Sequence, residues 1–257
     1  MPNSFRLLIS RIRRKEDLKF TKDGSPKLDK NGIQKKRILY PSLGRLKVIQ
    51  RRINKTVLAK LCLPDYAYGA VKNRDNVMNA RKHQGKKFNF TTDLTAFYPS
   101  INHHMVNEMF LSFKFSPTVA RILTQLTTYK GMIPQGAPTS SAVANLVFIK
   151  TGKKLQQFAV ENGITFTSFV DDLTFSAPVD FKDKTQAFID ALVSDGYRIS
   201  HSKTSYKTKN PVVTGVVVKN NKLDLTDGFK IKLTQLEGRT PEQIKGLFLY
   251  KEKVTNA

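Results

Sequence analysis

The sequence predicts an α+β fold centred on an antiparallel sheet, with strands and helices in the order β-α-β-β-α-β. The chain has 257 residues, of which 40% are apolar, so it is long enough for one large domain or for two to three subdomains around one sheet. In the middle third, apolar residues alternate over 88–92 and 164–176, which predicts strands. Helical periodicity separates and follows these strands.

The N-terminal part is basic and polar. Residues 4–18 are predicted to form a short basic helix, and residues 19–36 a polar loop or hairpin. A short strand over 36–40 precedes an amphipathic helix over 46–61. Cations at a helix start oppose the macrodipole, so we expect phosphate groups as their partners. The cations at this start are Arg45, Lys47, Arg51 and Arg52.

The centre of the chain carries an acid at the end of an apolar strand. The strand over 88–92 leads into Asp93, at a sheet edge where ligands are often held. A helix starting at residue 116 has an apolar stripe that is expected to be core, formed by Val119, Ile122, Leu123 and Leu126. The Gly- and Pro-rich stretch 131–140 excludes regular structure, and the next helix runs to about residue 162.

Residues 164–176 are predicted to form a hairpin with Asp171 and Asp172 at its turn. Adjacent carboxylates repel each other, and a hard cation would offset that cost, but a solvated Asp-Asp turn explains the pair equally well. The rest of the chain is predicted to form a helix, two strands and two short helices: 182–194, 212–218, 222–225, 227–237 and 241–253. The overall order is that of a ferredoxin-like split βαβ unit.

The charge of the chain indicates a polyanionic partner. Lys and Arg number 44 and Asp and Glu number 20, so the net charge is +24, and nucleic acid is the default partner for such an excess. An anionic membrane surface is the alternative, but no apolar run is long enough to span a bilayer and no signal peptide is apparent. The single cysteine, Cys62, excludes an intrachain disulfide and fits a reducing cytoplasm.

Three carboxylates are expected to converge. In a split βαβ sheet the first strand lies beside the central hairpin, which would bring Asp93 close to Asp171 and Asp172. Magnesium binds through one or two carboxylates plus substrate phosphates, and two ions can clamp an in-line phosphoryl transfer.

These residues resemble the polymerase motifs of reverse transcriptases, in the right order and spacing. Residues 93–101 are similar to the first motif, residues 135–141 with Asn145 to the second, and Phe169-Val170-Asp171-Asp172 to the third. Lys203 matches the basic residue that follows. The resemblance covers roughly residues 36–220.

Two further elements resemble those of bacterial retron reverse transcriptases, namely Asn79-Ala80-x-x-His83 and Val213-Thr214-Gly215. The resemblance implies a right-hand polymerase with fingers, a ferredoxin-like palm and a short thumb. Residues 1–90 would form the N-terminal basic helix and fingers, and 91–225 the palm, with a fingers-like insertion at about 113–140. Residues 226–257 would form the short helical thumb.

The resemblance also implies roles for individual residues. Two Mg²⁺ ions, with Mn²⁺ as an alternative, would be bound at a site formed by Asp93, Leu94, Asp171 and Asp172, the three acids being catalytic. Tyr98 would lie under the sugar of the incoming nucleotide and exclude a 2′-hydroxyl. The other nucleotide-binding residues would be Gln135, Gly136, Arg45, Lys47 and Lys203. RNA would contact Arg51, Arg52, Asn79 and His83.

The implied function is RNA-directed DNA synthesis in the bacterial cytoplasm, with no membrane partner. Part of a structured noncoding RNA would be copied into single-stranded DNA from dNTPs through an RNA–DNA hybrid, in antiphage defence together with an effector protein. One alternative is another defence-associated reverse transcriptase with protein or self priming. A second is a catalytically silent RNA-binding scaffold.

The sequence departs from the usual family pattern in three places. Phe169-Val170 replaces the usual Tyr-Ala before the acid pair, and Ser141 stands where proline is common. The segment after residue 225 is short for a thumb that grips a duplex. Either the thumb is minimal, or a partner or the RNA supplies the grip, or processivity is poor.

Overall fold

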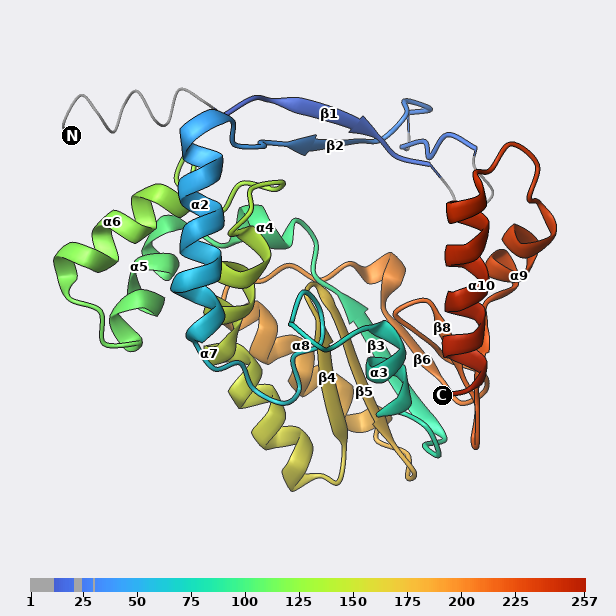
Figure 1. Ribbon diagram of the computed structural model, residues 1–257. Coiled ribbons are helices and arrows are strands. Elements are labelled where there is room, and N and C mark those ends of the chain that lie inside the picture. Colours follow the sequence, from blue (N-terminus) through green and yellow to red (C-terminus); the bar gives the residue numbers. More distant parts are fainter. Residues whose placement is uncertain (1–11, 21–24, 30) are drawn as a thin grey trace. The chain divides into compact units, whose positions relative to one another are not determined.

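The computed structural model describes residues 12–20, 25–29 and 31–257 (Figure 1). The chain forms two compact units. Unit 1 comprises Met1–Leu63 and Ala96–Ile149, and unit 2 comprises Pro64–Thr95 and Lys150–Ala257. The division by residue range into fingers, palm and thumb stays a prediction.

The central sheet of unit 2 has four strands. They are β3 (Phe88–Asp93), β4 (Thr165–Phe169), β5 (Asp172–Ala177) and β6 (Ser205–Lys207), in the spatial order β4-β5-β3-β6. All neighbouring strands are antiparallel. With β3 as the first strand, this is the order of a split βαβ unit, so the predicted α+β palm topology is confirmed.

Aromatic side chains hold the sheet to helix α8 (Thr185–Ser194), which follows the short 3₁₀ turn η2 (Lys182–Lys184). The rings of Phe166 and Phe175 stack with centroids 4.8 Å apart, and the Phe188 ring of α8 lies 4.1 Å from that of Phe175. Pairs of this kind each add about 1 kcal/mol beyond their burial. Val193 of the same helix is 55% exposed.

A second sheet of unit 2 contains β7 (Val212–Val213), β8 (Val216–Val218) and β9 (Leu223–Leu225). The single strand predicted over 212–218 is wrong. Thr214 and Gly215 have φ angles of +45° and +85°, so the chain reverses there. Residues with these angles cannot continue a strand, and β7 and β8 therefore pair antiparallel.

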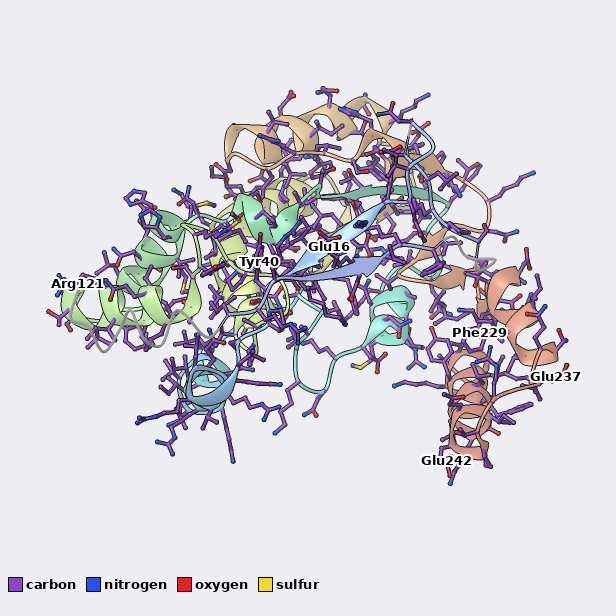
Figure 2. All side chains as sticks on the ribbon, turned by 90° about the horizontal axis from the view of Figure 1, so that it is seen from above. Glu16, Tyr40, Arg121, Phe229, Glu237 and Glu242 are labelled. Atoms are coloured by element: carbon purple, nitrogen blue, oxygen red, sulfur yellow. The ribbon has the colours of Figure 1, made fainter. Side chains whose placement is uncertain are left out.

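The C-terminal helices pack on this second sheet. They are α9 (Asp227–Thr234) and α10 (Pro241–Thr255), as predicted, and α10 begins with a capping box between Thr240 and Gln243. Phe229 of α9, labelled in Figure 2, lies with its ring 4.9 Å from that of Tyr250 on α10. Helix α3 (Asn76–Arg81) packs on the other side of the same apolar cluster through Val77 and Ala80.

Unit 1 begins with a two-stranded ribbon, β1 (Lys15–Leu18) paired antiparallel with β2 (Lys36–Leu39). The strand predicted over 36–40 is confirmed. The basic helix predicted over 4–18 lies partly outside the described residues, and over β1 the prediction is wrong, because this segment pairs with β2. Helix α2 (Gly44–Thr56) and a 3₁₀ turn, η1 (Leu58–Lys60), replace the single helix predicted over 46–61.

Four helices follow in unit 1: α4 (Phe97–Ser100), α5 (His103–Ser112), α6 (Pro117–Thr127) and the first part of α7 (Ser140–Glu161). The predicted start of α6 is confirmed, but its predicted core stripe is only partly right: Leu123 is buried, whereas Val119 and Ile122 are 42% and 37% exposed. The buried face consists of Ala120, Leu123, Thr124 and Thr127. Small side chains on this face allow α5 to approach α6 closely, which periodicity alone does not reveal.

No helix in the described part of the chain combines the length and the apolar composition needed to cross a bilayer.

Candidate functional site

The strand register of unit 2 places three carboxylates at one end of the sheet. Asp93, the last residue of β3, stands directly opposite Asp172, the first residue of β5. Phe169 of β4 also pairs with Asp172, so Val170 and Asp171 form a two-residue turn between β4 and β5. The Leu94 amide donates to the Asp171 carbonyl at 2.9 Å and ties this turn to the end of β3.

The turn has an unusual backbone. Val170 has a φ of +61°, a conformation that is costly for a β-branched residue. Gly69 makes room for it, because a Cβ at Gly69 would lie 2.6 Å from the Val170 nitrogen. The segment before Gly69 is fixed along β4, since the Tyr68 amide donates to the Ser168 carbonyl at 2.8 Å. Gly69 thereby sets the position of the turn that carries Asp171.

Lys203 contacts the first carboxylate. It ends the 3₁₀ turn η3 (His201–Lys203), and its Nζ lies 2.5 Å from Oδ2 of Asp93. The Asp93 side chain is 10% exposed, whereas that of Lys203 is 56% exposed. A nearly buried carboxylate requires a positive partner, and the Lys203 ammonium supplies one. The predicted contact of Lys203 with a nucleotide stays a proposal.

The electrostatics of the site disfavour a third negative charge. Burial of the carboxyl among protein atoms raises the pKa of Asp172 to about 6, with further contributions from the Asp171 and Asp93 carboxylates. Lys203 acts in the opposite direction. Asp172 as a residue still has an exposed edge, so solvent screens part of this repulsion. Three acids with one ammonium leave a site that gains from bound cations.

The donor set fits a hard divalent cation. Carboxylate oxygens are the ligands that Mg²⁺ prefers, and the ammonium on Asp93 shows that this position accepts a positive charge. Within the described residues, no group of three or more His, Cys, Asp or Glu side chains is already arranged to hold a metal ion. The side chain of Leu94 is buried at 1% exposure, so only its backbone is suited to a metal site. The assignment of these residues as metal ligands stays a prediction.

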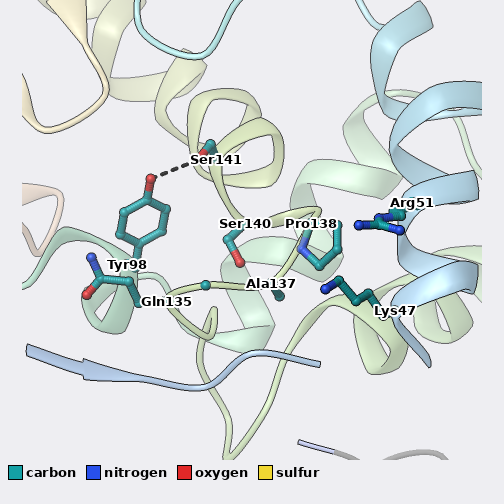
Figure 3. Close-up of a pocket in the computed structure, with 9 residues that line it drawn as sticks. Lys47, Arg51, Tyr98, Gln135, Ala137, Pro138, Ser140 and Ser141 are labelled. Atoms are coloured by element: carbon teal, nitrogen blue, oxygen red, sulfur yellow. Dashed lines mark hydrogen bonds between the residues drawn. The ribbon is translucent and has the colours of Figure 1, made fainter. Parts of the chain in front are cut away.

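A cavity in unit 1 gathers most of the residues predicted to bind the nucleotide. Its volume is about 380 Å³, and it is lined by Lys47, Arg51, Tyr98, Gln135 and Gly136 together with residues from the start of α7 (Figure 3). Lys47 and Arg51 lie one turn apart on α2 and bring two cations to the same rim (Figure 3).

Tyr98 is held in place by its neighbours. It lies on the short helix α4, which follows Ala96 at a φ of +52°. Its hydroxyl is hydrogen-bonded to Ser141 Oγ at 2.9 Å (Figure 3). The preceding Phe97 is buried and packs edge-on against Phe148 of α7, with ring centroids 5.9 Å apart. These contacts fix the position of the Tyr98 ring, which forms one wall of the cavity.

The Gln135-Gly136 segment presents its backbone to the same cavity. The Tyr40 amide donates to the Gln135 carbonyl at 2.7 Å, which joins this loop to the end of β2. Gly136 has a φ of +102°, where other residues are strained, and a Cβ there would lie 3.6 Å from that of Leu39.

Two of the four predicted cations on α2 lie outside this cavity. Arg45 and Arg52 are on α2 but are exposed, and neither lines the cavity. Arg51, which was predicted to contact RNA, lines it instead. Contacts of Arg45 and Arg52 with phosphate remain proposals.

The predicted RNA contacts of Asn79 and His83 are corrected by their burial. Asn79 is 1% exposed and His83 is 0% exposed, so neither side chain offers a surface to RNA. The two ring nitrogens of His83 contact the hydroxyls of Ser176, at 2.6 Å, and Thr167, at 2.8 Å. Asn79 donates to Thr214 Oγ1 at 3.3 Å. Both residues hold unit 2 together.

Sequence reasoning missed Gly69 as part of the site. A single glycine in an irregular stretch carries no signal of its own, and its role depends on a contact with Val170, about 100 residues further along the chain. Ser141 was singled out as a departure from the family pattern, but its bond to Tyr98 requires the geometry of the cavity.

Comparison with known proteins agrees with this geometry. Residues 28–231 match the family model described as reverse transcriptase (RNA-dependent DNA polymerase). Similar curated proteins include the retron Se72 reverse transcriptase of Salmonella heidelberg, 33% identical over 78% of this chain and 56% of that protein. The retron Ec86 reverse transcriptase of Escherichia coli is 32% identical over 77% of this chain and 63% of that protein. The chain thus spans about 56–63% of the length of these relatives.

Solved structures share the fold at low sequence identity. Telomerase from Candida albicans, solved with a fragment of telomeric RNA, is 11% identical, with a TM-score of 0.56. The match covers 92% of this chain and 51% of the telomerase chain. Apo telomerase from Candida tropicalis is 13% identical, with a TM-score of 0.51, and the match covers 79% of this chain and 42% of the telomerase chain. The match of the family model over most of the chain shows that the protein belongs to the reverse transcriptase family, and its curated relatives are of the retron type.

Proposed function

We propose that the chain is an RNA-directed DNA polymerase of the retron type, which copies part of a structured noncoding RNA into single-stranded DNA. The observation that carries this proposal is the register of β3 and β5, which sets Asp93 opposite Asp172 with Asp171 in the adjoining turn. A pair of carboxylates on neighbouring strands, next to a third in a tight turn, suits the binding of metal ions and phosphates.

In the proposed reaction, Asp93, Asp171 and Asp172 hold two Mg²⁺ ions, with Mn²⁺ as an alternative. When bound, such ions supply activation of a primer hydroxyl and neutralisation of a triphosphate. Lys203 balances the charge of Asp93, and its exposed side chain would also be able to contact a substrate phosphate.

The cavity of unit 1 is proposed to bind the incoming dNTP. Lys47 and Arg51 supply positive charge for the phosphates, and the Gln135-Gly136 backbone borders the nucleotide. The Tyr98 ring, which Ser141 holds in place, is proposed to exclude a 2′-hydroxyl and so to select deoxynucleotides.

The setting of the reaction is proposed from the relatives and the charge. With a net charge of +24, the chain suits an RNA template and an RNA–DNA hybrid. Because the relatives are retron reverse transcriptases of bacteria, we further propose a dedicated noncoding RNA, a bacterial cytoplasmic location, and a role in antiphage defence with an effector protein.

The test is extension of a DNA primer on an RNA template with dNTPs and Mg²⁺. Asp171→Asn should lower the rate about 10³-fold, because it removes several kcal/mol of charge stabilisation. Asp183→Asn is the matched control, since Asp183 is 73% exposed and lies outside the site, and it should extend normally. Equal extension by both variants would contradict the proposed role of the carboxylates.

The biological part of the proposal needs its own readout. DNA joined to one small RNA should co-purify with the wild-type protein expressed from its own locus, and should be missing with Asp171→Asn. Protection against phage should disappear with it. If the variant kept full protection, the protein would act as an RNA-binding scaffold instead.

A further inference from the structure

A second cavity of unit 1 lies along helices α5 and α6 and the turn that follows α6. Its volume is about 590 Å³, and it shares no lining residue with the cavity around Tyr98. Small residues, Thr124, Thr128 and Gly131, form part of its wall and leave the space open. A cavity of this size is large enough for a nucleotide.

The turn after α6 is fixed at the start of α5. Tyr129 and Met132 exchange two backbone hydrogen bonds, of 2.8 and 3.1 Å, and the two residues between them, Lys130 and Gly131, have φ angles of +50° and +77°. The His103 amide donates to the Gly131 carbonyl at 2.9 Å. Since a lysine at positive φ is costly, the turn holds Lys130 at the cavity rim against a local preference.

The lining is cationic. Arg121, labelled in Figure 2, lies on α6, and Lys130 lies on the turn. His103 and His104 also line the cavity, and the lining contains no Asp or Glu. In the ranges that the structure describes, no carboxylate lies within ion-pair distance of Arg121 or Lys130, and the Glu108 carboxylate is engaged by His104 Nε2 at 3.2 Å.

One buried polar atom of the lining lacks a partner. Thr124 is 6% exposed, and its Oγ1 makes no hydrogen bond with any described residue. A buried hydroxyl without a partner is costly, and native structures rarely leave one unexplained. Because this oxygen is itself buried, it adds no hydrogen-bonding group to the cavity surface, and recognition of a ligand depends on the other lining side chains.

The remaining lining suits a planar ligand with polar edges. The Tyr129 ring lies 5.3 Å from the Tyr40 ring and 5.6 Å from Lys130 Nζ, so it combines an aromatic face with a nearby cation. Asn107 and Gln125 add side-chain amides, which both donate and accept hydrogen bonds. An aromatic face, amides and cations without a carboxylate partner are the groups that bind a base together with its phosphate.

We propose that this cavity binds one nucleotide of a single-stranded RNA, with the base against Tyr129 and the phosphate toward Arg121 and Lys130. The identification of the ligand as RNA rests on the proposed function, whereas the nucleotide chemistry rests on the cavity itself. The same chemistry fits a free nucleotide, and the experiment separates these two sources.

The first test is binding of a short fluorescein-labelled oligouridylate, measured by anisotropy in EDTA without dNTPs. Tyr129→Leu should weaken binding about tenfold because it removes the stacking face without changing the charge, and Tyr129→Phe should bind like the wild type. Thermal unfolding of both variants identifies any loss that comes from misfolding. Equal affinity of the folded Tyr129→Leu and Tyr129→Phe variants would overturn the proposal.

The second test concerns the cations. Arg121→Gln with Lys130→Gln should lower the slope of log affinity against log salt by about 1.4, which corresponds to two phosphate contacts on a single strand. Lys55→Gln with Lys60→Gln removes the same charge outside both cavities and should leave the slope unchanged. Equal slopes for the two double variants would mean that Arg121 and Lys130 contribute only as general surface charge, and this result would overturn the proposal.

Competition with uridine monophosphate separates the two sources. No displacement of the oligouridylate at millimolar concentration supports a nucleotide within a strand. Displacement that Tyr129→Leu abolishes overturns the RNA assignment and identifies a free nucleotide as the ligand. Because the binding assay contains neither metal nor dNTPs, its failure is distinct from a failure of primer extension.

Discussion

His83 predicts a specific dependence of stability on pH. The ring is completely buried and bridges two strands, with Nδ1 at Ser176 Oγ of β5 and Nε2 at Thr167 Oγ1 of β4. Burial lowers the pKa of His83 to about 3, and the nearby Lys86 ammonium lowers it as well. The folded protein therefore keeps this histidine neutral, so that one ring nitrogen donates to a hydroxyl and the other accepts from one.

The direction and the size of this pH effect on stability follow from the linkage between proton binding and folding. An unfolded histidine has a pKa of about 6.5, so at lower pH the unfolded chain binds a proton that the folded chain refuses. Stability is complete above the unfolded pKa and falls as the pH drops toward the folded value. For pKa values of about 6.5 and about 3, the loss between pH 7 and pH 5 is about 2 kcal/mol.

The assay is urea unfolding at pH 7 and at pH 5. His83→Gln should be less stable than the wild type at pH 7, because it disturbs a buried network, but its stability should fall by about 2 kcal/mol less on going to pH 5. His104→Gln is the control, since the His104 side chain is 74% exposed, and it should follow the wild type. If His83→Gln and the wild type lost equal stability between the two pH values, the reasoning about the buried neutral ring would be refuted.

Three more predictions concern the candidate site. Gly69→Ala places a methyl group 2.6 Å from the Val170 nitrogen, so primer extension should fall about 100-fold while RNA binding persists; full activity would show that the turn adapts. Ser141→Ala removes the bond to Tyr98, so discrimination against ribonucleotides should fall about fivefold, through KM for the nucleotide. Tyr98→Phe should have the same effect, and the double variant should add nothing. Asp172→Asn should stabilise the metal-free protein at pH 7 by about 1 kcal/mol, a value obtained from the rise of the Asp172 pKa to about 6 and discounted for solvent screening. The gain should vanish below about pH 4, where the carboxyl is protonated in the folded and in the unfolded chain. A destabilised variant in metal-free urea unfolding would contradict the repulsion inferred at this carboxyl.

The sequence was sufficient for the features that follow from local pattern and strand order. Asp93 ends an apolar strand, and Asp171 and Asp172 occupy a short turn between two alternating segments. A split βαβ order then requires these strands to be neighbours, so their convergence was predictable without coordinates.

The sequence-based predictions failed where packing overrides hydrophobic periodicity, or where backbone angles determine whether a strand continues. The buried face of α6 is rotated away from Val119 and Ile122, because the small residues Ala120 and Thr124 let α5 approach. The β7–β8 reversal depends on positive φ at Thr214, a residue that ordinarily favours strands. A short motif predicts that a residue matters, but it does not predict whether that residue faces a ligand or the protein interior.

The elements Asn79-Ala80-x-x-His83 and Val213-Thr214-Gly215 illustrate this last point, because they contact each other. Asn79 donates to Thr214 Oγ1 at 3.3 Å. Asn76, on the same helix α3, donates to the Thr214 carbonyl at 3.1 Å and to the Tyr250 hydroxyl of α10 at 2.6 Å, and Thr214 Oγ1 donates to the Asn76 carbonyl at 3.2 Å.

The same short helix is anchored at both ends. Asp75 caps α3 and pairs with Lys253 of α10 at 2.7 Å, while His83 lies between β4 and β5 beyond its other end. Helix α3 therefore joins the C-terminal helix to the hairpin that carries Asp171 and Asp172. A change in either of these two motifs, which lie about 130 residues apart, therefore alters the support of the carboxylates as well as the placement of α10.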